Sequence, residues 1–112
     1  MLYLVIDKVK VEFQPADSSL AQLKMLAQTF KMYEDYKRAG KLKVVYAFAD
    51  IPGGISIWDV ESNEELQRIL FLLPTMPFMN REVRPLTNIE SVNTLVNELI
   101  DIVKSMPSRP SR

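Results

Sequence analysis

Cysteine and histidine are both absent from this 112-residue sequence. Without them the chain has no disulfide bond, no thiol nucleophile, no imidazole base and no zinc site built from cysteine and histidine. An excess of one charge is also lacking, because 14 basic residues balance 14 acidic ones. This balance gives no electrostatic footprint for nucleic acid, so we expect no nucleic-acid partner. Any catalysis must use carboxylates, lysine, tyrosine, hydroxyl groups or backbone amides, and we expect neither a metal nor a cofactor.

Long hydrophobic runs are absent as well. The apolar segment Ile69–Leu73 is far too short to span a bilayer. The sequence MLYLVIDKVKVEF at the amino terminus lacks the basic region and the long apolar run of a signal peptide. We therefore expect a cytoplasmic protein with no membrane partner. The length and a hydrophobic content of 47% suit one small domain, which we place at residues 1–106, with residues 107–112 as a disordered tail.

The order of helical and extended patterns predicts the fold class. Alternating or continuous apolar patterns predict strands at residues 2–13, 43–49, 55–60 and 79–85, and helical periodicity predicts helices at 19–39, 63–72 and 88–106. Pro52-Gly53-Gly54 predicts a hairpin, and capping boxes at residues 62–65 and 87–90 mark the start of the last two helices. The result is an α+β protein, a ferredoxin-like βαββαβ antiparallel sheet with an extra C-terminal helix.

The first helix has an unusually wide apolar arc. Its main apolar face is predicted to consist of Leu20, Leu23, Leu26, Ala27, Phe30 and Tyr33. A second stripe beside it consists of Met25, Thr29, Met32 and Tyr36. Because one sheet needs an arc of only about 100°, we infer that this helix is covered on two sides, by its own sheet and by another subunit. The alternative is a small domain that exposes some Met and Tyr side chains.

The segment from Gly53 to Leu86 carries a resemblance to a known family. It reads GGISIWDVESNEELQRILFLLPTMPFMNREVRPL, and its most specific pieces are SIWDVES at residues 56–62 and the pair Leu73-Pro74 with Pro77-Phe78-Met79. This pattern of residues resembles that of the muconolactone isomerase family. The resemblance implies a dimeric α+β barrel, hence a homodimer or a higher homo-oligomer. It also implies a pocket between sheet and helices, where a proton is moved within an unsaturated lactone without a cofactor.

Several polar residues of the family pattern are replaced in this sequence. A gap-free alignment places the family's Glu-Lys pair on Thr29 and Phe30, its Trp-Arg on Tyr46 and Ala47, and an Asn on Gly54. These replacements argue against the same reaction on the same substrate. The helix that follows Ile89 also extends beyond the usual end of the family, where it is expected to change the assembly or to cap the pocket.

Glu34 is the candidate general base, because it is the one acid on the apolar side of the first helix. Burial beside aromatic rings would raise its pKa into the useful range. The alternative is a helix-end carboxylate that reaches solvent and pairs with Lys37 or Arg38. The candidate substrate-binding residues are Tyr33, Tyr46, Phe48, Ser56, Trp58, Met79 and Arg81.

Four of these candidates alternate along two adjacent strands. If the faces coincide, Tyr46, Phe48, Ser56 and Trp58 form a concave aromatic wall for a flat ligand; otherwise they are ordinary core. Arg81 could bind a substrate carboxylate as a two-pronged fork, or serve only as an edge-strand charge.

Two functions follow from these features. The first is a cofactor-independent isomerase or lyase acting on a small unsaturated cyclic acid or lactone. The second is a non-catalytic small-ligand-binding or oligomeric assembly protein on the same scaffold.

Overall fold

The computed structural model describes residues 1–10 and 19–107. Its strands are β1 (Leu2–Val9), β2 (Leu42–Ala47), β3 (Gly53–Asp59) and β4 (Met79–Leu86). Its helices are α1 (Ser19–Arg38), α2 (Asn63–Leu72), the 3₁₀ turn η1 (Met76–Phe78) and α3 (Ile89–Ser105). The element order agrees with the sequence prediction. The predicted far end of the first strand, the turn after it and most of the predicted tail lie outside the described residues.

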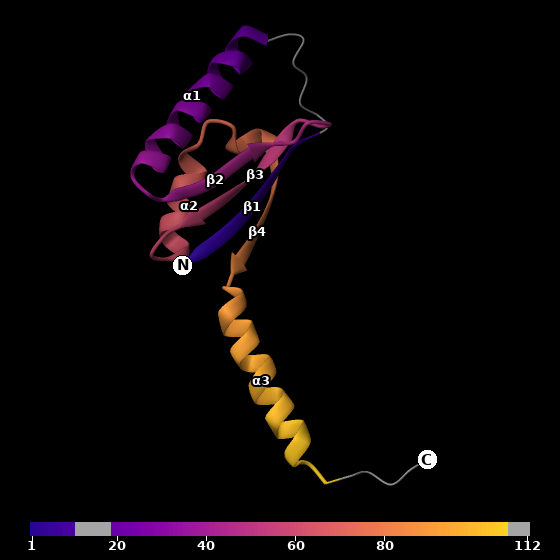
Figure 1. Cartoon of the computed structure of the whole chain (residues 1–112). Coiled ribbons are helices and arrows are strands. Elements are labelled where there is room, and N and C mark those ends of the chain that lie inside the picture. Colours follow the sequence, from indigo (N-terminus) through magenta and orange to yellow (C-terminus); the bar gives the residue numbers. More distant parts are fainter. Residues whose placement is uncertain (11–18, 108–112) are drawn as a thin grey trace.

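The four strands form one antiparallel sheet in the order β2-β3-β1-β4, which is the ferredoxin-like order, with α1 and α2 on the same side of the sheet (Figure 1). The register fixes the two faces of the sheet. Tyr3 pairs with Trp58 and Pro85, and Val5 pairs with Ser56 and Val83, so these residues share the face under the helices. The intervening residues, such as Leu4 and Ile57, point to the opposite face, which no element covers in Figure 1.

The core lies between the sheet and the two helices. Its buried hydrophobic members are Tyr3, Val5, Leu42, Trp58, Val60, Leu66, Ile69, Leu70 and Leu73. Trp58 is fully buried at the centre, with edge-on contacts to Tyr36 at 5.4 Å and to Tyr33 at 6.3 Å between ring centroids. Aromatic pairs in this geometry add to the stabilisation that comes from burial alone. The sheet and α1 are therefore joined through one indole ring.

α1 turns the second of its two apolar stripes to the sheet, together with Tyr33 of the first. Thr29 is buried, and Met32, Tyr33 and Tyr36 pack against the core. Most of the first stripe points outward, since Leu20, Leu23 and Phe30 are 65%, 62% and 55% exposed. The sequence analysis did not assign either stripe to the sheet, because both are apolar and hydrophobicity alone does not rank them.

The C-terminal ends of the helices follow their sequence signals. α1 ends at Arg38, and Gly40 two residues later has a φ of 77°, the left-handed conformation that glycine adopts without strain. The amide of Gly40 donates to the Lys37 carbonyl and that of Lys41 to the Tyr36 carbonyl, which is a Schellman cap.

The N-terminal caps differ in detail from the predicted capping boxes. Ser62 caps α2 by accepting from the Glu65 amide at 3.1 Å, but the Glu65 carboxylate turns away to accept from Lys41 at 2.7 Å. The cap of α3 is Asn88, which accepts from the Ser91 amide, so the expected capping role of Thr87 is wrong.

α3 stands apart from the rest of the molecule. It continues from the end of β4 and points away from the sheet (Figure 1), giving the chain principal extents of 70 × 36 × 24 Å. Every residue of α3 is exposed. Within residues 1–10 and 19–107, no helix has the length and hydropathy required to cross a bilayer. The extra C-terminal helix is thus confirmed, but it does not pack onto the core.

Candidate functional site

A charged pair lies in the interior between the sheet and the helices. Asp7 of β1 and Arg81 of β4 face each other directly in the strand register. The Arg81 Nε donates to Asp7 Oδ1 at 2.6 Å and Nη2 donates to Oδ2 at 3.3 Å, with side chains only 14% and 12% exposed. Nη1 of Arg81 also donates to the Leu70 carbonyl of α2 at 3.3 Å. Such a two-pronged bond holds the guanidinium in a fixed plane under the helices.

Tyr33 brings a hydroxyl group from α1 to the same region. Burial raises the pKa of the Tyr33 hydroxyl above its ordinary value of 10.0; the negative charge of Asp7 adds to the increase, and the positive charge of Arg81 opposes it. The phenol is therefore neutral at physiological pH and available as a hydrogen-bond donor. Its ring also contacts Trp58, so Tyr33 connects the charged pair to the aromatic centre of the core.

Ser56 adds a second hydroxyl group from β3. It is buried, and its Oγ accepts from Trp58 Nε1 at 2.8 Å. Ser56 pairs with Val5 in the register, one position along the same face from Asp7. A carboxylate, a guanidinium, two hydroxyl groups and an indole thus belong to one interior region. Groups of these kinds can remove a proton beside a carbonyl and stabilise the negative charge that develops on oxygen.

Four of the predicted site residues belong to this interior. Ser56, Trp58 and Arg81 point from the sheet toward the helices, and Tyr33 points from α1 toward the sheet. Met79 has the same inward parity on β4, two residues before Arg81, and is partly buried. Five of the seven predicted binding residues thus lie on one side of the sheet. Their binding role stays a prediction.

The predicted aromatic wall on β2 and β3 is wrong. Ser56 pairs with Val45, whereas Tyr46 pairs with Ile55 and points to the opposite face, where it is 68% exposed. A register shift between Leu42 and Val44 sets this alignment, and the sequence pattern did not reveal it. Phe48 lies beyond the end of β2 and is partly buried. Neither Tyr46 nor Phe48 joins Ser56 and Trp58 in one surface.

Glu34 does not share the interior with the other candidates. It is exposed on the outer side of α1, a turn after Phe30, so it is not buried beside aromatic rings in this chain. Asp35, rather than Glu34, pairs with Arg38. Nothing in these contacts tests a catalytic role for Glu34, but its position is the solvent-reaching one that the sequence analysis gave as the alternative.

Asp7 is the functional candidate that sequence reasoning missed. One signal was present: Tyr3, Val5 and Asp7 alternate along β1, so a carboxylate continues an apolar face and needs a partner there. The partner, Arg81, is 74 residues away in the sequence, and only the pairing of β1 with β4 brings the two together.

Comparison with known proteins gives this interior its context. The family profile of muconolactone delta-isomerase matches residues 1–91. A muconolactone delta-isomerase from Rhodococcus opacus is 38% identical over 71 residues, covering 63% of this chain and 70% of that protein. The corresponding protein of Acinetobacter baylyi is 34% identical over 86 residues, covering 77% of this chain and 88% of its own. The chain belongs to the muconolactone delta-isomerase family.

Solved structures agree with this family membership. A crystal structure of muconolactone isomerase superposes with a TM-score of 0.65 at 27% identity, covering 79% of this chain and 90% of that one. The 5-chloro-2-hydroxyhydroquinone dehydrochlorinase of Burkholderia phenoliruptrix superposes at 0.62 with 18% identity and 79% and 95% coverage, which shows the shared fold alone. Both neighbours have the dimeric α+β barrel fold. Because the family match ends at residue 91, most of α3 lies outside it.

The replaced family positions can now be located. Thr29, where a Glu is expected, is buried against the sheet and donates to the Met25 carbonyl at 3.0 Å. Gly54, where an Asn is expected, lies directly opposite Asp7, and a Cβ there would collide with the carbonyl oxygen of Tyr46. The acid in this interior therefore comes from the sheet at Asp7, not from α1 at Thr29.

Proposed function

We propose that this protein is a cofactor-independent isomerase or lyase that moves a proton within a small unsaturated cyclic acid or lactone. The observation that carries the proposal is the Asp7–Arg81 pair beside Tyr33, in the interior of a muconolactone delta-isomerase family member. Relatives at 34% and 38% identity bear the name of such an isomerase.

The proposed chemistry uses one carboxylate as both base and acid. The Asp7 carboxylate removes the acidic hydrogen from the carbon beside a carbonyl group, and the electron pair of that bond forms an enolate. The Arg81 guanidinium and the neutral Tyr33 hydroxyl stabilise the enolate oxygen. Asp7 then returns the proton to the far end of the conjugated system, which shifts the double bond with no net change in composition.

Asp7 is preferred over Glu34 as the base because of its surroundings. Asp7 is largely buried with a cation and next to a phenol, whereas Glu34 is exposed on the outer side of α1. A carboxylate held in a water-poor site interacts more strongly with a developing charge than an exposed one does. Glu34 is therefore the matched control carboxylate.

The test is proton exchange in heavy water, followed by proton NMR with muconolactone and a panel of related unsaturated lactones and ring acids. Exchange reports enolate formation even for a substrate that is not fully converted. Asp7→Asn should slow exchange by about 10²–10⁴-fold, and Glu34→Gln should match the wild type. Loss of exchange in Glu34→Gln with retention in Asp7→Asn would reverse the assignment. Thermal unfolding of both variants shows whether the fold is intact.

A second candidate function is assembly without catalysis, and the uncovered face of the sheet favours it. This face carries Leu2, Leu4, Ile6, Val44, Tyr46, Ile55, Ile57 and Leu86. Glu82 and Arg84 of the edge strand β4 lie on the same face and pair with each other at 2.6 Å. An apolar sheet face with one charged pair at its edge is suited to a second copy of the chain. We propose self-association through this face whether or not the protein is an enzyme. Absence of exchange with every compound, in a protein that is oligomeric by light scattering, would favour assembly as the whole function.

A further inference from the structure

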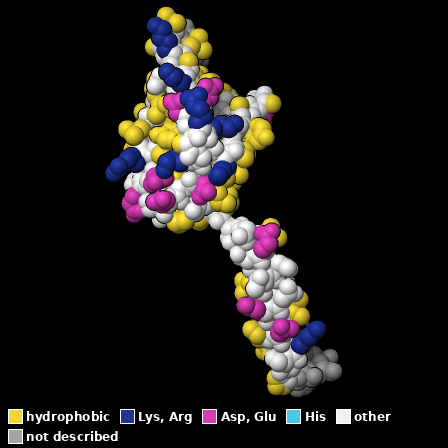
Figure 2. Space-filling view, turned by 60° about the vertical axis from the view of Figure 1, so that its left-hand side comes forward, with side chains coloured by type: hydrophobic (Ala, Val, Ile, Leu, Met, Phe, Trp, Pro, Cys, Tyr) yellow, Lys and Arg dark blue, Asp and Glu magenta, His cyan; other side chains and the backbone are white. Residues whose placement is uncertain are grey.

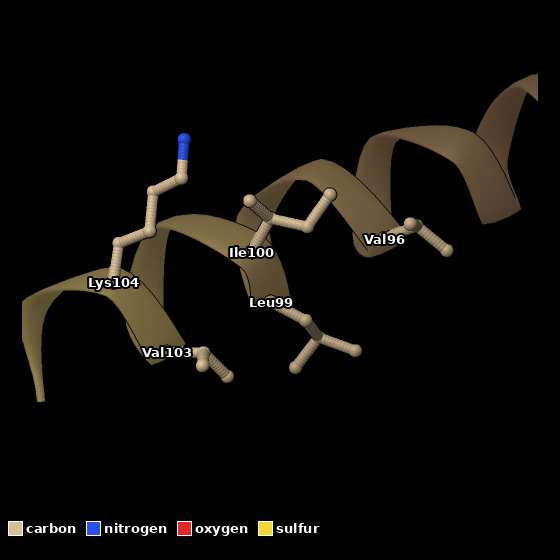
Figure 3. Close-up of a pocket in the computed structure, with 5 residues that line it drawn as sticks. All are labelled: Val96, Leu99, Ile100, Val103 and Lys104. Carbon is tan, nitrogen blue, oxygen red and sulfur yellow. The ribbon is translucent and has the colours of Figure 1, made fainter.

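α3 presents an apolar stripe that nothing covers. The stripe consists of Ile89, Val92, Leu95, Val96, Leu99, Ile100, Ile102, Val103 and Met106, each between 40% and 76% exposed. Figure 3 shows the five residues that line a shallow hollow on this helix: Val96, Leu99, Ile100, Val103 and Lys104. All five come from α3 itself, so no other element encloses the hollow. A contiguous exposed patch of this extent marks an interaction site.

The helix also needs a partner for its own stability. A 17-residue helix is about 25 Å long, and isolated helices near this length are only marginally stable in water. Helices of proteins gain most of their stability by packing an amphipathic face. The polar side of α3, with Glu90, Asn97 and Asp101, faces the other way around the helix, and Glu98 lies at its border with the apolar stripe. α3 is thus built to pack along one side.

The outer face of α1 is a second exposed apolar helical surface in the described part of the chain. We use this term for Leu20, Leu23, Ala27 and Phe30, all of which are exposed. They recur at helical spacing along the first part of α1, and the exposed residue one turn after Phe30 is the charged Glu34. The outer face covers eleven residues, from Leu20 to Phe30, and the apolar stripe of α3 covers eighteen, from Ile89 to Met106, so the outer face can cover somewhat more than half of the stripe.

The strand order keeps these two surfaces apart within one chain. α1 packs nearest to β2, at one edge of the sheet, whereas α3 follows β4 at the opposite edge. Only Thr87 and Asn88 connect β4 to α3, and α3 points away from the domain (Figure 1). To reach the outer face of its own α1, α3 would have to cross the whole sheet. A second copy of the chain meets no such obstacle.

The charges of the two helices are complementary. α3 has three acidic residues and one basic residue, whereas α1 has four basic residues and two acidic ones. Figure 2 shows acidic side chains along the projecting helix and basic side chains toward the opposite end of the molecule. Lys24 and Lys31 stand one turn after Leu20 and Ala27, at the border of the outer face. Glu98 stands beside the apolar stripe, and among the described residues these three charged groups form no ion pair.

We propose that α3 of one copy packs on the outer face of α1 of a second copy, with Glu98 beside Lys24 and Lys31. The contact uses two surfaces that are otherwise exposed, and reciprocal exchange of two helices doubles the buried area. The acidic polar side of α3 makes an anionic membrane surface a poor alternative. The interface is separate from the uncovered sheet face and does not depend on catalysis.

The test compares aspartate substitutions on and off the two surfaces. Leu99→Asp on the α3 stripe and Phe30→Asp on the outer face of α1 should each raise the dissociation constant of one assembly step at least tenfold. Matched controls place the same charge on the polar sides, with Asn97→Asp on α3 and Gln28→Asp on α1, and should assemble like the wild type. Sedimentation velocity over a concentration series measures the steps, and circular dichroism checks the fold. Because the substituted side chains are exposed, the monomer fold should be unaffected.

A charge exchange then identifies the partner surface. Glu98→Lys and Lys31→Glu should each weaken the same step, and the two changes together should restore part of it. Dissociation by Leu99→Asp but not by Phe30→Asp would overturn the proposal, because α3 would then pack on something other than α1. A wild type that stays monomeric at all concentrations, or that binds anionic vesicles without self-association, would overturn it as well. If only the sheet-face dimer persists in both aspartate variants, the α3 contact is supported and the proposed sheet interface is retained.

Discussion

The sheet domain and α3 solve the same physical problem in different ways. Both are rich in apolar residues at regular spacing, but the domain buries its own around Trp58, whereas α3 buries none. α3 has the cleaner separation of apolar and polar sides. The difference teaches that an amphipathic pattern specifies a helix and its contact face, but not which surface the face contacts. In the domain the chain supplies that surface itself.

The largest expected difference in the free energy of unfolding is between Trp58→Ala in the domain and Leu99→Ala on α3. Trp58 is fully buried at the centre of the core, so its truncation should lower the free energy of unfolding by about 3–5 kcal/mol. Leu99→Ala on α3 removes a side chain that is 49% exposed, so it should leave the unfolding of the dilute domain almost unchanged. Urea unfolding followed by circular dichroism measures both variants. Equal losses would show that α3 is part of the domain core after all.

Removal of one cation from the sheet domain and one from α3 should give the next largest difference in the free energy of unfolding. Arg81→Met leaves the Asp7 carboxylate unpaired in the interior and should cost about 3 kcal/mol. Lys104→Met on exposed α3 should cost less than about 0.5 kcal/mol. The double variant Asp7→Leu/Arg81→Met should recover most of the loss, since no buried charge is then left alone.

The outcome of this cycle separates two roles of the Asp7–Arg81 pair. Recovery of stability together with loss of proton exchange would show that the pair is kept for chemistry and not for the fold. A double variant as unstable as Arg81→Met alone would show that the two residues stabilise the fold through separate contacts.

The sequence predicted the fold well because its signals are local. Pro52-Gly53-Gly54, the Ser62 cap and the Gly40 cap each act within a few residues, and together they determine the element order. The candidate site was predicted less well because it depends on register. Tyr46 points away from Trp58 because of one shift in the β2–β3 pairing, and Asp7 meets Arg81 only through the pairing of β1 with β4. Neither fact can be read from spacing along the chain.

The orientation of α1 shows a second limit of prediction from the sequence. One tyrosine from each of the two apolar stripes packs on Trp58, while two of the leucines and Phe30 of the first stripe point outward. Coverage of α1 on a second side stays a prediction. Which stripe faces the sheet depends on the shape of the core, which the helix sequence does not contain.

Removal of the N-terminal caps of α2 and α3 should give the smallest difference in stability between the domain and α3. Ser62→Ala should cost about 1 kcal/mol of global stability, because Ser62 accepts from the Glu65 amide at the start of α2, and α2 is part of the core. Asn88→Ala removes the equivalent bond to the Ser91 amide of α3. In dilute protein that loss should appear only as faster amide exchange in the first turns of α3, with the midpoint of domain unfolding unchanged, since α3 unfolds independently of the core. At concentrations where the proposed α3–α1 contact forms, Asn88→Ala should also lower the unfolding midpoint. An equal effect at low and high concentration would contradict a partner for α3, because only association makes the stability of that helix depend on the amount of protein.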